Sequence, residues 1–212
     1  MTRTLLPYGR VQTSSAAEGL QLAIMAPSAN AVLVEREAKI IGDKRARYLD
    51  LLSRVRASWS KVAEAVDALS ASNERADAAI SAFITACKLK GGAALVAEIR
   101  SMWGGLTPTK VIKSAYSTQL YIMDSFLERL DARTTLKLPE DRLAEMRAEH
   151  QTMKICHLTL EQLQSAHAAL VKELESTERE FLEAYRLLIR DLIVNWDEAE
   201  LRATLRTFER DA

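Results

Sequence analysis

The sequence is poor in the residues that interrupt helices. It contains seven glycines and four prolines in 212 residues, with no glycine after Gly105 and no proline after Pro139. Because these two residues are the strongest helix breakers, the chain beyond Pro139 lacks the usual signals that end a helix. Its 48% hydrophobic and 27% charged residues are typical of an ordered, soluble protein. These features predict an all-α fold.

The chain also lacks an excess of charge, a disulfide framework and a long apolar run. Lys and Arg number 29, as do Asp and Glu, so the general attraction that nucleic-acid binding needs is missing. Cys87 and Cys156 fall at core-spaced helical positions, where a thiol behaves as a small apolar side chain. No uninterrupted apolar run suits a membrane span, and the start lacks the apolar segment of a secretory signal. We expect no nucleic-acid partner and a cytoplasmic location, with peripheral membrane attachment as an alternative.

An apolar repeat between residues 48 and 87 is the most informative feature that is present. Eleven of its twelve members are apolar or aromatic, which is typical of a helix supercoiled with others. The repeat predicts a helix of about 60 Å at 1.5 Å per residue, with Trp59 in its core. Asn73 is expected either to fix the register or to mark a local gap. The members, which alternate by four and three residues, are Tyr48, Leu52, Val55, Trp59, Val62, Val66, Leu69, Asn73, Ala76, Ile80, Phe83 and Cys87.

The first 34 residues differ from the remainder in their local signals. Ser15 and Glu18 have capping-box spacing before an apolar run that Pro27 ends, which predicts a short amphipathic helix over residues 15–25. We therefore expect residues 1–34 to form an N-terminal arm with this helix. Residues 35–212 are expected to form a bundle of long helices.

Start and stop signals divide the bundle into three expected helices. The first spans about residues 35–90 and stops at Gly91-Gly92. Thr107 caps the second and Pro108 is its first residue, and this helix reaches about residue 133. The third opens at Pro139 and has no obvious terminator before about residue 208. Helices of such unequal length do not match end to end, so the third is expected to extend beyond the others.

The third helix carries a seam of its own, from Cys156 to Leu188, and its far end is apolar nearly all round. Such a helix must be covered on several sides, and we expect a second copy of the chain to supply part of the cover. The residues assigned to this dimer interface are Leu188, Leu192 and Trp196. The predicted fold is an all-α, elongated antiparallel bundle of three long helices with heptad packing, which forms a dimer.

Residues suited to catalysis or metal binding are scarce. His150, His157 and Cys156 could share a helix face, but a metal site needs three or four converging donors, and Glu-x-x-His pairs are absent from the sequence. His167 lies in the seam, which favours a core or interhelical hydrogen-bonding role. Neither a nucleophile elbow nor a phosphate loop is present. We expect no enzyme activity, catalytic residue, metal or cofactor, with a metal- or carboxylate-based enzyme as a minor alternative.

Charge is distributed unevenly although it sums to zero. Residues 35–61 carry eight basic and four acidic residues, and Arg47, Arg54 and Lys61 lie seven apart on one outward stripe. Residues 161–212 carry seven basic and twelve acidic residues. The two regions are expected to complement each other across the bundle or dimer, a term that orients association more than it tightens it. An external acidic partner for the stripe is the alternative.

A second basic zone surrounds the predicted turn region. Glu98 is the one acid among its five basic residues, and Trp103 lies within it. An exposed Trp among basic residues would suit an anionic membrane surface or an acidic protein. A Trp folded back onto the bundle is the alternative. The residues assigned to partner or membrane contact here are Lys88, Lys90, Trp103, Lys110 and Lys113.

The layout of these features resembles BAR domains, especially those at the C-termini of sorting nexins. The resemblance covers residues 15–208. It is carried by the seam from Tyr48 to Cys87, the basic turn with Lys88, Lys90, Lys110 and Lys113, and a final helix with Phe181, Tyr185 and Trp196. It implies a crescent-shaped homodimer whose concave basic face lies on phospholipid. The short second helix and the zero net charge depart from the family.

Two functional hypotheses follow from the sequence. The first is a cytoplasmic, homodimeric helical-bundle scaffold or assembly protein that binds a protein partner through the Arg47, Arg54 and Lys61 stripe and the turn around Trp103. The second is a BAR-like, curvature-sensing dimer that binds membranes through the same basic residues and the helix over residues 15–25.

Overall fold

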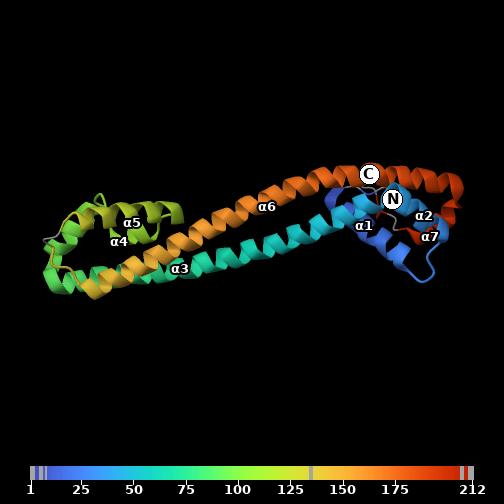
Figure 1. The fold of residues 1–212 in the computed structure, drawn as a ribbon. Helices are drawn as coiled ribbons and strands as arrows, with labels where there is room; N and C mark the ends of the chain where they lie inside the picture. The colour runs from blue at the N-terminus through green and yellow to red at the C-terminus, as the bar shows by residue number, and fades with distance from the viewer. Residues whose placement is uncertain (1–2, 5–6, 8, 134–135, 206–207, 210–212) are drawn as a thin grey trace. The chain divides into compact units, whose positions relative to one another are not determined.

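The computed structural model describes residues 3–4, 7, 9–133, 136–205 and 208–209 (Figure 1). Nearly all of this part of the chain is helical, which confirms the predicted all-α class. One short pairing joins β1 (Arg3–Thr4) and β2 (Phe208–Glu209) in antiparallel register, with Arg3 opposite Glu209. The helices are α1 (Gly9–Met25), α2 (Ala31–Ile40), α3 (Gly42–Met102), α4 (Pro108–Ile112), α5 (Tyr116–Asp131), α6 (Glu140–Asn195) and α7 (Glu198–Thr204).

The chain divides into two compact units. Unit 1 comprises residues 1–59 and 166–212, and unit 2 comprises residues 60–165. Unit 1 therefore contains α1, α2, α7, the start of α3 and the end of α6. Unit 2 contains α4, α5, the rest of α3 and the first part of α6.

Unit 1 has an aromatic core between α3 and α6. Tyr48 of α3 stacks on Phe181 of α6 with ring centroids 5.2 Å apart, and Phe181 also contacts Tyr185 at 5.7 Å. All three side chains are almost completely buried. Around them lie small and apolar residues from α1, α2 and α7, which are Ala16, Ala17, Leu20, Leu33, Leu201 and Leu205, the last directly after α7. The two ends of the sequence therefore build one core.

Unit 2 has its main core where α3, α5 and the start of α6 meet. Phe126 of α5 contacts Phe83 of α3 at 6.3 Å and Trp103 at 5.2 Å between ring centroids. Leu143 and Met146 of α6 belong to the same buried cluster. A smaller cluster continues along the two long helices, with Leu69 and Met153 as members.

Several predicted helix boundaries are wrong, and local signals explain the differences. The first long helix is divided at Ile41, because α2 ends there and α3 begins at Gly42. The predicted second helix is two helices, α4 and α5, separated by residues 113–115. The third ends at Asn195, since Asp197 caps α7 by accepting hydrogen bonds from the amides of Ala199 and Glu200.

The Gly91-Gly92 pair interrupts α3 as a kink, where the sequence predicted an end. Gly92 has φ 64° and ψ −157°, a backbone conformation that side-chain-bearing residues rarely adopt. Helical geometry resumes after it and continues to Met102. The residues beyond the kink turn their apolar side chains, including Ile99 and Met102, into the core of unit 2.

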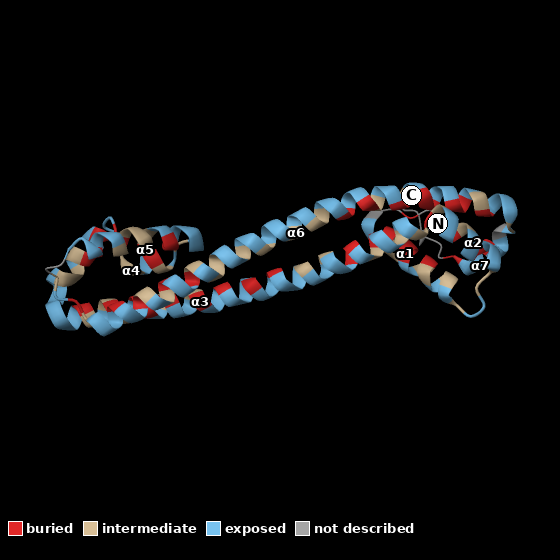
Figure 2. Ribbon diagram, in the orientation of Figure 1, coloured by how far each residue is buried: buried red, intermediate tan, exposed pale blue. Residues whose placement is uncertain are grey.

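The predicted seam of α3 is buried at most of its positions, and two members near its middle are exposed. Tyr48, Leu52, Val62 and Leu69 are buried, as are the four members from Ala76 to Cys87. Trp59 is 61% exposed and Val66 is 46% exposed, so the prediction that Trp59 lies in the core is wrong. The heptad pattern located one face of α3 correctly, but it did not show how many neighbouring helices cover that face (Figure 2).

Candidate interaction surfaces

The basic stripe of α3 is engaged within its own chain at Arg47. The Arg47 guanidinium lies 3.8 Å from carboxylate oxygens of both Glu173 and Glu180 on α6. Arg54 pairs with Asp50 of its own helix at 3.7 Å, and Lys61 is exposed on α3 in unit 2. The predicted complementarity between the basic and acidic regions is therefore confirmed at Arg47. Arg54 and Lys61 keep their cationic groups at the surface.

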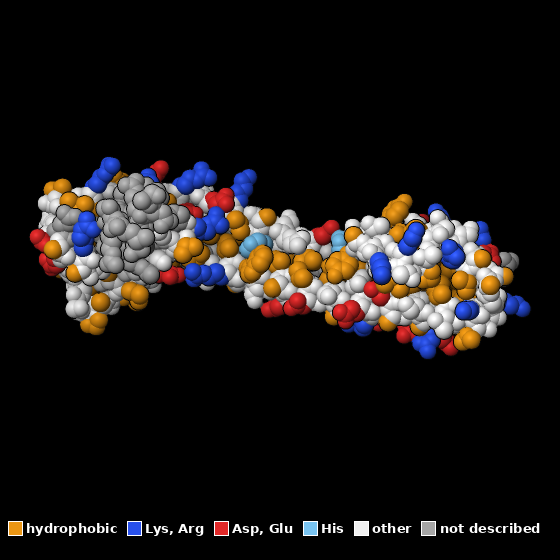
Figure 3. All heavy atoms as spheres, turned by 180° about the vertical axis from the view of Figure 1, so that it is seen from behind, with side chains coloured by type: hydrophobic (Ala, Val, Ile, Leu, Met, Phe, Trp, Pro, Cys, Tyr) orange, Lys and Arg blue, Asp and Glu red, His pale blue; other side chains and the backbone are white. Residues whose placement is uncertain are grey.

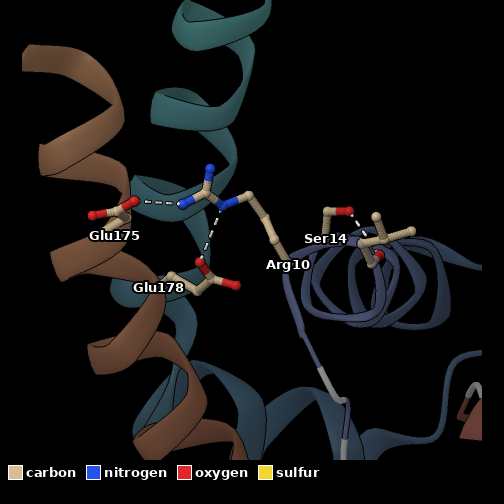
Figure 4. Close-up of polar contacts among 5 residues, drawn as sticks. Arg10, Ser14, Glu175 and Glu178 are labelled. Carbon is tan, nitrogen blue, oxygen red and sulfur yellow. Dashed lines mark hydrogen bonds and ion pairs between the residues drawn. The ribbon is translucent and has the colours of Figure 1, made fainter. Parts of the chain in front are cut away.

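Arg10 of α1 is a further partner of the acidic region, and the sequence prediction missed it. Its guanidinium lies 2.9 Å from Glu175 and 3.5 Å from Glu178, both on α6 (Figure 4). Arg56 of α3 pairs with Glu18 of α1 at 3.2 Å. These exposed pairs each contribute little to stability, but together they set α1 against α3 and α6.

The basic turn region of unit 2 is exposed at its lysines. Lys88, Lys90, Lys110 and Lys113 all lie at the surface. Lys90 is held in place, because its Nζ donates a hydrogen bond of 2.7 Å to the backbone carbonyl of Leu138. The other three lysines, Lys88, Lys110 and Lys113, expose their cationic groups to solvent.

Trp103 does not belong to that surface. Its side chain is 3% exposed and packs against Phe126 in the core of unit 2. The prediction that Trp103 forms an exposed contact is therefore wrong, and the alternative of a Trp folded back onto the bundle is confirmed. The cause lies in the next two residues, because Gly104 and Gly105 both adopt positive φ and turn the chain sharply.

Leu89, and not Trp103, is the exposed large apolar residue among the lysines of this region. It is 85% exposed and lies between Lys88 and Lys90, directly before the Gly91-Gly92 kink. The sequence held a signal for it, because Leu89 falls two residues after the seam member Cys87 and so points away from the seam. A large apolar side chain between two lysines marks a candidate contact surface.

One face of the apolar end of α6 is covered by the same chain, whereas Leu187, Ile193 and Val194 are exposed. Leu188 and Leu192 are completely buried and share a core with Leu20 of α1, Leu33 of α2 and Leu201 of α7. The prediction that Leu188 and Leu192 form a dimer interface is therefore wrong. Trp196, the third residue of that prediction, is partly buried against the same core. The short N-terminal helices and α7 supply the cover that a second copy was expected to give.

An exposed apolar strip lies instead on the long helices within unit 2. Its members are Val66 of α3 and Ile155 and Leu158 of α6, which are 46%, 55% and 50% exposed. Arg75 pairs with Glu149, and Leu69 clusters with Met153, so α3 and α6 run in opposite directions here. Val66 then comes level with Leu158. Figure 3 shows hydrophobic side chains gathered along this stretch. We call Val66, Ile155 and Leu158 the apolar strip.

Trp59 and His167 form a partly exposed pair in unit 1. Their ring centroids are 5.4 Å apart, and the His167 Nδ1 lies 2.7 Å from the Ser58 hydroxyl. This contact joins α3 to α6, which confirms the predicted interhelical hydrogen-bonding role of His167. The Trp59 ring packs against the His167 ring, and 61% of the Trp59 surface remains exposed to solvent.

A buried polar network joins α3 to α5 around Asp77. The Gln119 amide donates a hydrogen bond of 2.7 Å to one carboxylate oxygen of Asp77, and the Asn73 amide donates one of 3.1 Å to the other. Burial raises the pKa of the Asp77 carboxyl above its usual value and outweighs these hydrogen bonds, which act to lower it. Asn73 is thus part of a network that fixes how α5 lies on α3, consistent with a role in register.

A second network joins α5 to α6 around Asp124. His150 Nε2 and Lys154 Nζ each lie 2.7 Å from a different oxygen of the Asp124 carboxylate. Burial acts to raise the pKa of Asp124, but hydrogen bonds from His150 and Lys154 outweigh it and hold the pKa below its usual value. His150 is buried, and Asp124 is the partner that reaches it from α5.

Asp124→Asn is expected to destabilise unit 2 at neutral pH. The folded state lowers the pKa of this carboxyl, so the stabilisation is complete above the unfolded pKa of about 4 and is lost as pH falls through the lowered value. The gap in unfolding free energy between wild type and variant should therefore narrow below about pH 4. Urea titrations over a pH series would measure it, and a gap independent of pH would contradict the assignment.

The cysteines and histidines do not assemble a reactive centre in the described residues. Burial raises the pKa of the Cys87 thiol to about 11, although nearby Lys90 acts to lower it, so the thiol stays protonated at neutral pH. Cys156 is partly buried, and both cysteines are free. His157 lies 3.7 Å from Glu161. Among the described residues, no group of three or more His, Cys, Asp or Glu is placed to hold a metal ion.

One helix meets a composition test for crossing a membrane. Within the described residues, α3 contains an 18-residue window with a mean hydropathy of 1.4, and 22% of that window is buried. The core helices of soluble proteins pass the same test, so this is weak evidence for a span.

Comparison with known proteins gives no relative. No known family, curated protein or solved structure matches the chain. The residues described above therefore carry the functional argument by themselves.

Proposed function

We propose that this chain is a non-enzymatic helical scaffold that forms a homodimer through the apolar strip and binds a protein partner. The single observation that carries the proposal is the exposure of Val66, Ile155 and Leu158 on a stretch of long helices. Exposed large apolar side chains at one level of a pair of helices are candidates for an interaction site. The other large apolar residues of α3 and α6 are mostly covered within their units.

The position of the strip supports a contact with a further pair of helices. In unit 2, α5 contributes Leu120 to the cluster with Leu69 and Met153, so its cover reaches that level of the long helices. Val66 and Leu158 lie beyond it, where α3 and α6 face each other as a pair. Two helices bury one stripe each and leave their flanks open, whereas four helices enclose a core.

A second copy of the chain is the partner that fits the strip best. Because α3 and α6 run antiparallel, two such pairs related by a two-fold axis would place the same apolar strip on both sides of the contact. The charged residues close to the strip in sequence are Lys61, Glu64 and Asp67 on α3 and Glu161 on α6.

A protein partner would then use the basic side chains left outside the dimer. Arg54 is half-exposed and its pair with Asp50 lies within one helix, so an acidic partner can replace that weak contact. Lys61 is exposed on the same helix. Charged surface contacts of this kind act mainly on the rate and selectivity of association.

Leu158→Glu is expected to convert the dimer to a monomer without loss of helix. A charge placed at the centre of the strip would be desolvated on association and would face its own copy. Light scattering should give twice 23.7 kDa for the wild type and 23.7 kDa for the variant. Circular dichroism checks that the helices remain, and Leu158→Gln is the milder variant if the charge unfolds the chain.

Val194→Glu provides the matched control for that experiment. Val194 is 82% exposed in unit 1 and lies outside the apolar strip, so its replacement should leave the dimer mass unchanged. A monomeric wild type would refute the proposal, as would a dimer that survives Leu158→Glu and Leu158→Gln.

The second candidate function is the BAR-like one, a dimer that binds and senses the curvature of membranes. The observation that favours it is the basic charge of residues 88–113, which hold five basic residues and one acid. Such a surface is attracted to anionic lipid headgroups. Vesicle binding separates this function from that of a scaffold that binds proteins alone.

A further inference from the structure

The segment that surrounds the Gly92 kink is exposed over seven consecutive residues. Residues 88–94, with the sequence Lys-Leu-Lys-Gly-Gly-Ala-Ala, are all exposed, although both flanking parts of α3 contribute to the core of unit 2. We call this segment the apex. It contains two lysines, one leucine and four small residues, so its side chains are either cationic or apolar.

The stretch of sequence that contains the apex carries charge of one sign. No acidic residue occurs between Asp77 and Glu98. Glu98 is itself engaged, because Arg133 lies 2.9 Å from its carboxylate. Lys88 belongs to the apex, and Lys110 of α4 and Lys113 directly after α4 are also exposed and add to the positive charge of unit 2.

Acidic residues do approach one side of the apex. Lys90 lines a shallow groove with Glu140, Asp141 and Arg142 at the start of α6, and its Nζ is bonded to the Leu138 carbonyl. Lys90 is therefore a residue that fixes the apex against α6. Lys88, Lys110 and Lys113 are among the cations that remain to meet a ligand.

Leu89 is the one large apolar side chain of the apex. With 85% of its surface exposed, it is the most exposed of the large apolar side chains that the structure describes. Lys88 beside it has a long aliphatic stem and can extend its ammonium group away from a buried leucine. Gly91 and Gly92 follow without side chains to hold this surface away from a flat partner.

We propose that the apex binds the surface of an anionic membrane, with Leu89 inserted between the headgroups and Lys88, Lys110 and Lys113 lying on the lipid phosphates. This inference rests on the second candidate function and names the residues that would perform it. Apolar insertion combined with attraction to anionic lipid is how peripheral proteins bind membranes without crossing them. An acidic protein would satisfy the lysines but gives no reason for an isolated leucine at the point of the segment.

The test is flotation of the full chain with vesicles of phosphatidylcholine alone and of phosphatidylcholine mixed with phosphatidylserine. We expect binding to the mixed vesicles at low salt, weakened by high salt because the headgroup attraction is screened. Lys110→Gln and Lys113→Gln should each weaken binding about fivefold, since one lysine near the surface is worth roughly 1 kcal/mol. Leu89→Asn should weaken it about tenfold by removing the inserted side chain.

Val194→Asn is the matched control for Leu89→Asn. Val194 of α6 is 82% exposed and belongs to unit 1, so the change removes a comparable exposed apolar side chain outside the basic region and outside α1. It should leave vesicle binding unchanged. Leu22→Asn tests the rival contact through α1, where Leu22 is 72% exposed. If Leu22→Asn abolishes binding while Leu89→Asn does not, the contact belongs to α1 and the proposal is overturned.

Two further results would also overturn the proposal. One is equal binding to vesicles with and without phosphatidylserine, and the other is no binding to either. Light scattering on the same samples measures the oligomeric state independently of vesicle binding. A monomer that binds mixed vesicles through Leu89 would support the apex and refute the dimer, whereas a dimer that ignores vesicles would do the reverse.

Discussion

Phe181→Ala is expected to lower the free energy of unfolding by about 3–5 kcal/mol, because it empties the centre of the core of unit 1. Phe181 is completely buried and contacts the rings of both Tyr48 and Tyr185. Its removal leaves a cavity and breaks a stacked aromatic pair. Urea denaturation followed by circular dichroism would measure the loss.

Trp59→Ala is the matched comparison on the same pair of helices. The sequence pattern placed both aromatic residues in heptad seams, yet Trp59 is 61% exposed and Phe181 is not exposed at all. The Trp59 change should therefore cost less than about 1 kcal/mol, which is usual for a surface substitution. Equal losses for the two variants would show that Trp59 is covered in solution.

Glu37→Ala is expected to cost about 3–5 kcal/mol, because it leaves the Arg45 guanidinium with an uncompensated charge in a largely buried site. Glu37 and Arg45 lie 2.6 Å apart, and their side chains are 4% and 13% exposed. Arg45 also donates to the Gln21 side chain at 3.1 Å. The pair thus joins α2 and α3 to α1, and thermal unfolding of the variant would measure its loss.

The double variant Glu37→Leu with Arg45→Met tests whether the loss of stability comes from the unpaired Arg45 charge or from the loss of the contact itself. Because both charged groups leave together, most of the lost stability should return. Arg54→Ala is the surface control, since the Arg54 and Asp50 pair is half-exposed and should cost less than about 0.5 kcal/mol. If Glu37→Ala costs no more than Arg54→Ala, the pair is not buried in solution.

The sequence predicted the helical class and much of the core because apolar spacing records which face of a helix is buried. Tyr48, Phe83, Phe181 and Leu188 were all placed in seams, and all four are buried. The same pattern does not show how many neighbouring helices cover that face. For that reason Val66, an equal member of its seam, lies partly exposed.

The N-terminal helices were underestimated because their core residues are small and weakly patterned. Ala16 and Ala17 are buried against the end of α6, but two alanines give little periodic signal. Without that cover the sequence pointed to a second copy around Leu188 and Leu192. The break at Gly42 had a signal in the sequence, since a glycine there follows the end of α2.

The candidate contact surfaces were predicted in part. The lysines of the turn region are exposed as expected, because a charged side chain is rarely buried without a partner. Trp103 was predicted to be exposed but is buried, and Leu89 is the exposed apolar residue of this region. Their exposure depends on the turn at Gly104 and the kink at Gly92 and not on their own chemistry. Spacing along a helix cannot show where the chain turns back on itself.

The division of the sequence between the two units has a consequence for synthesis on the ribosome. Unit 2 is one continuous segment, so all of its residues are synthesised before residues 166–212 of unit 1. Leu20, Leu33 and Tyr48 are made first but find Phe181 and Leu188 only after unit 2 has been synthesised. The nascent chain must therefore keep this apolar surface from aggregating while more than a hundred residues are added. Closing unit 1 is then the slow, non-local step of folding, and it depends on helices that are made after unit 2.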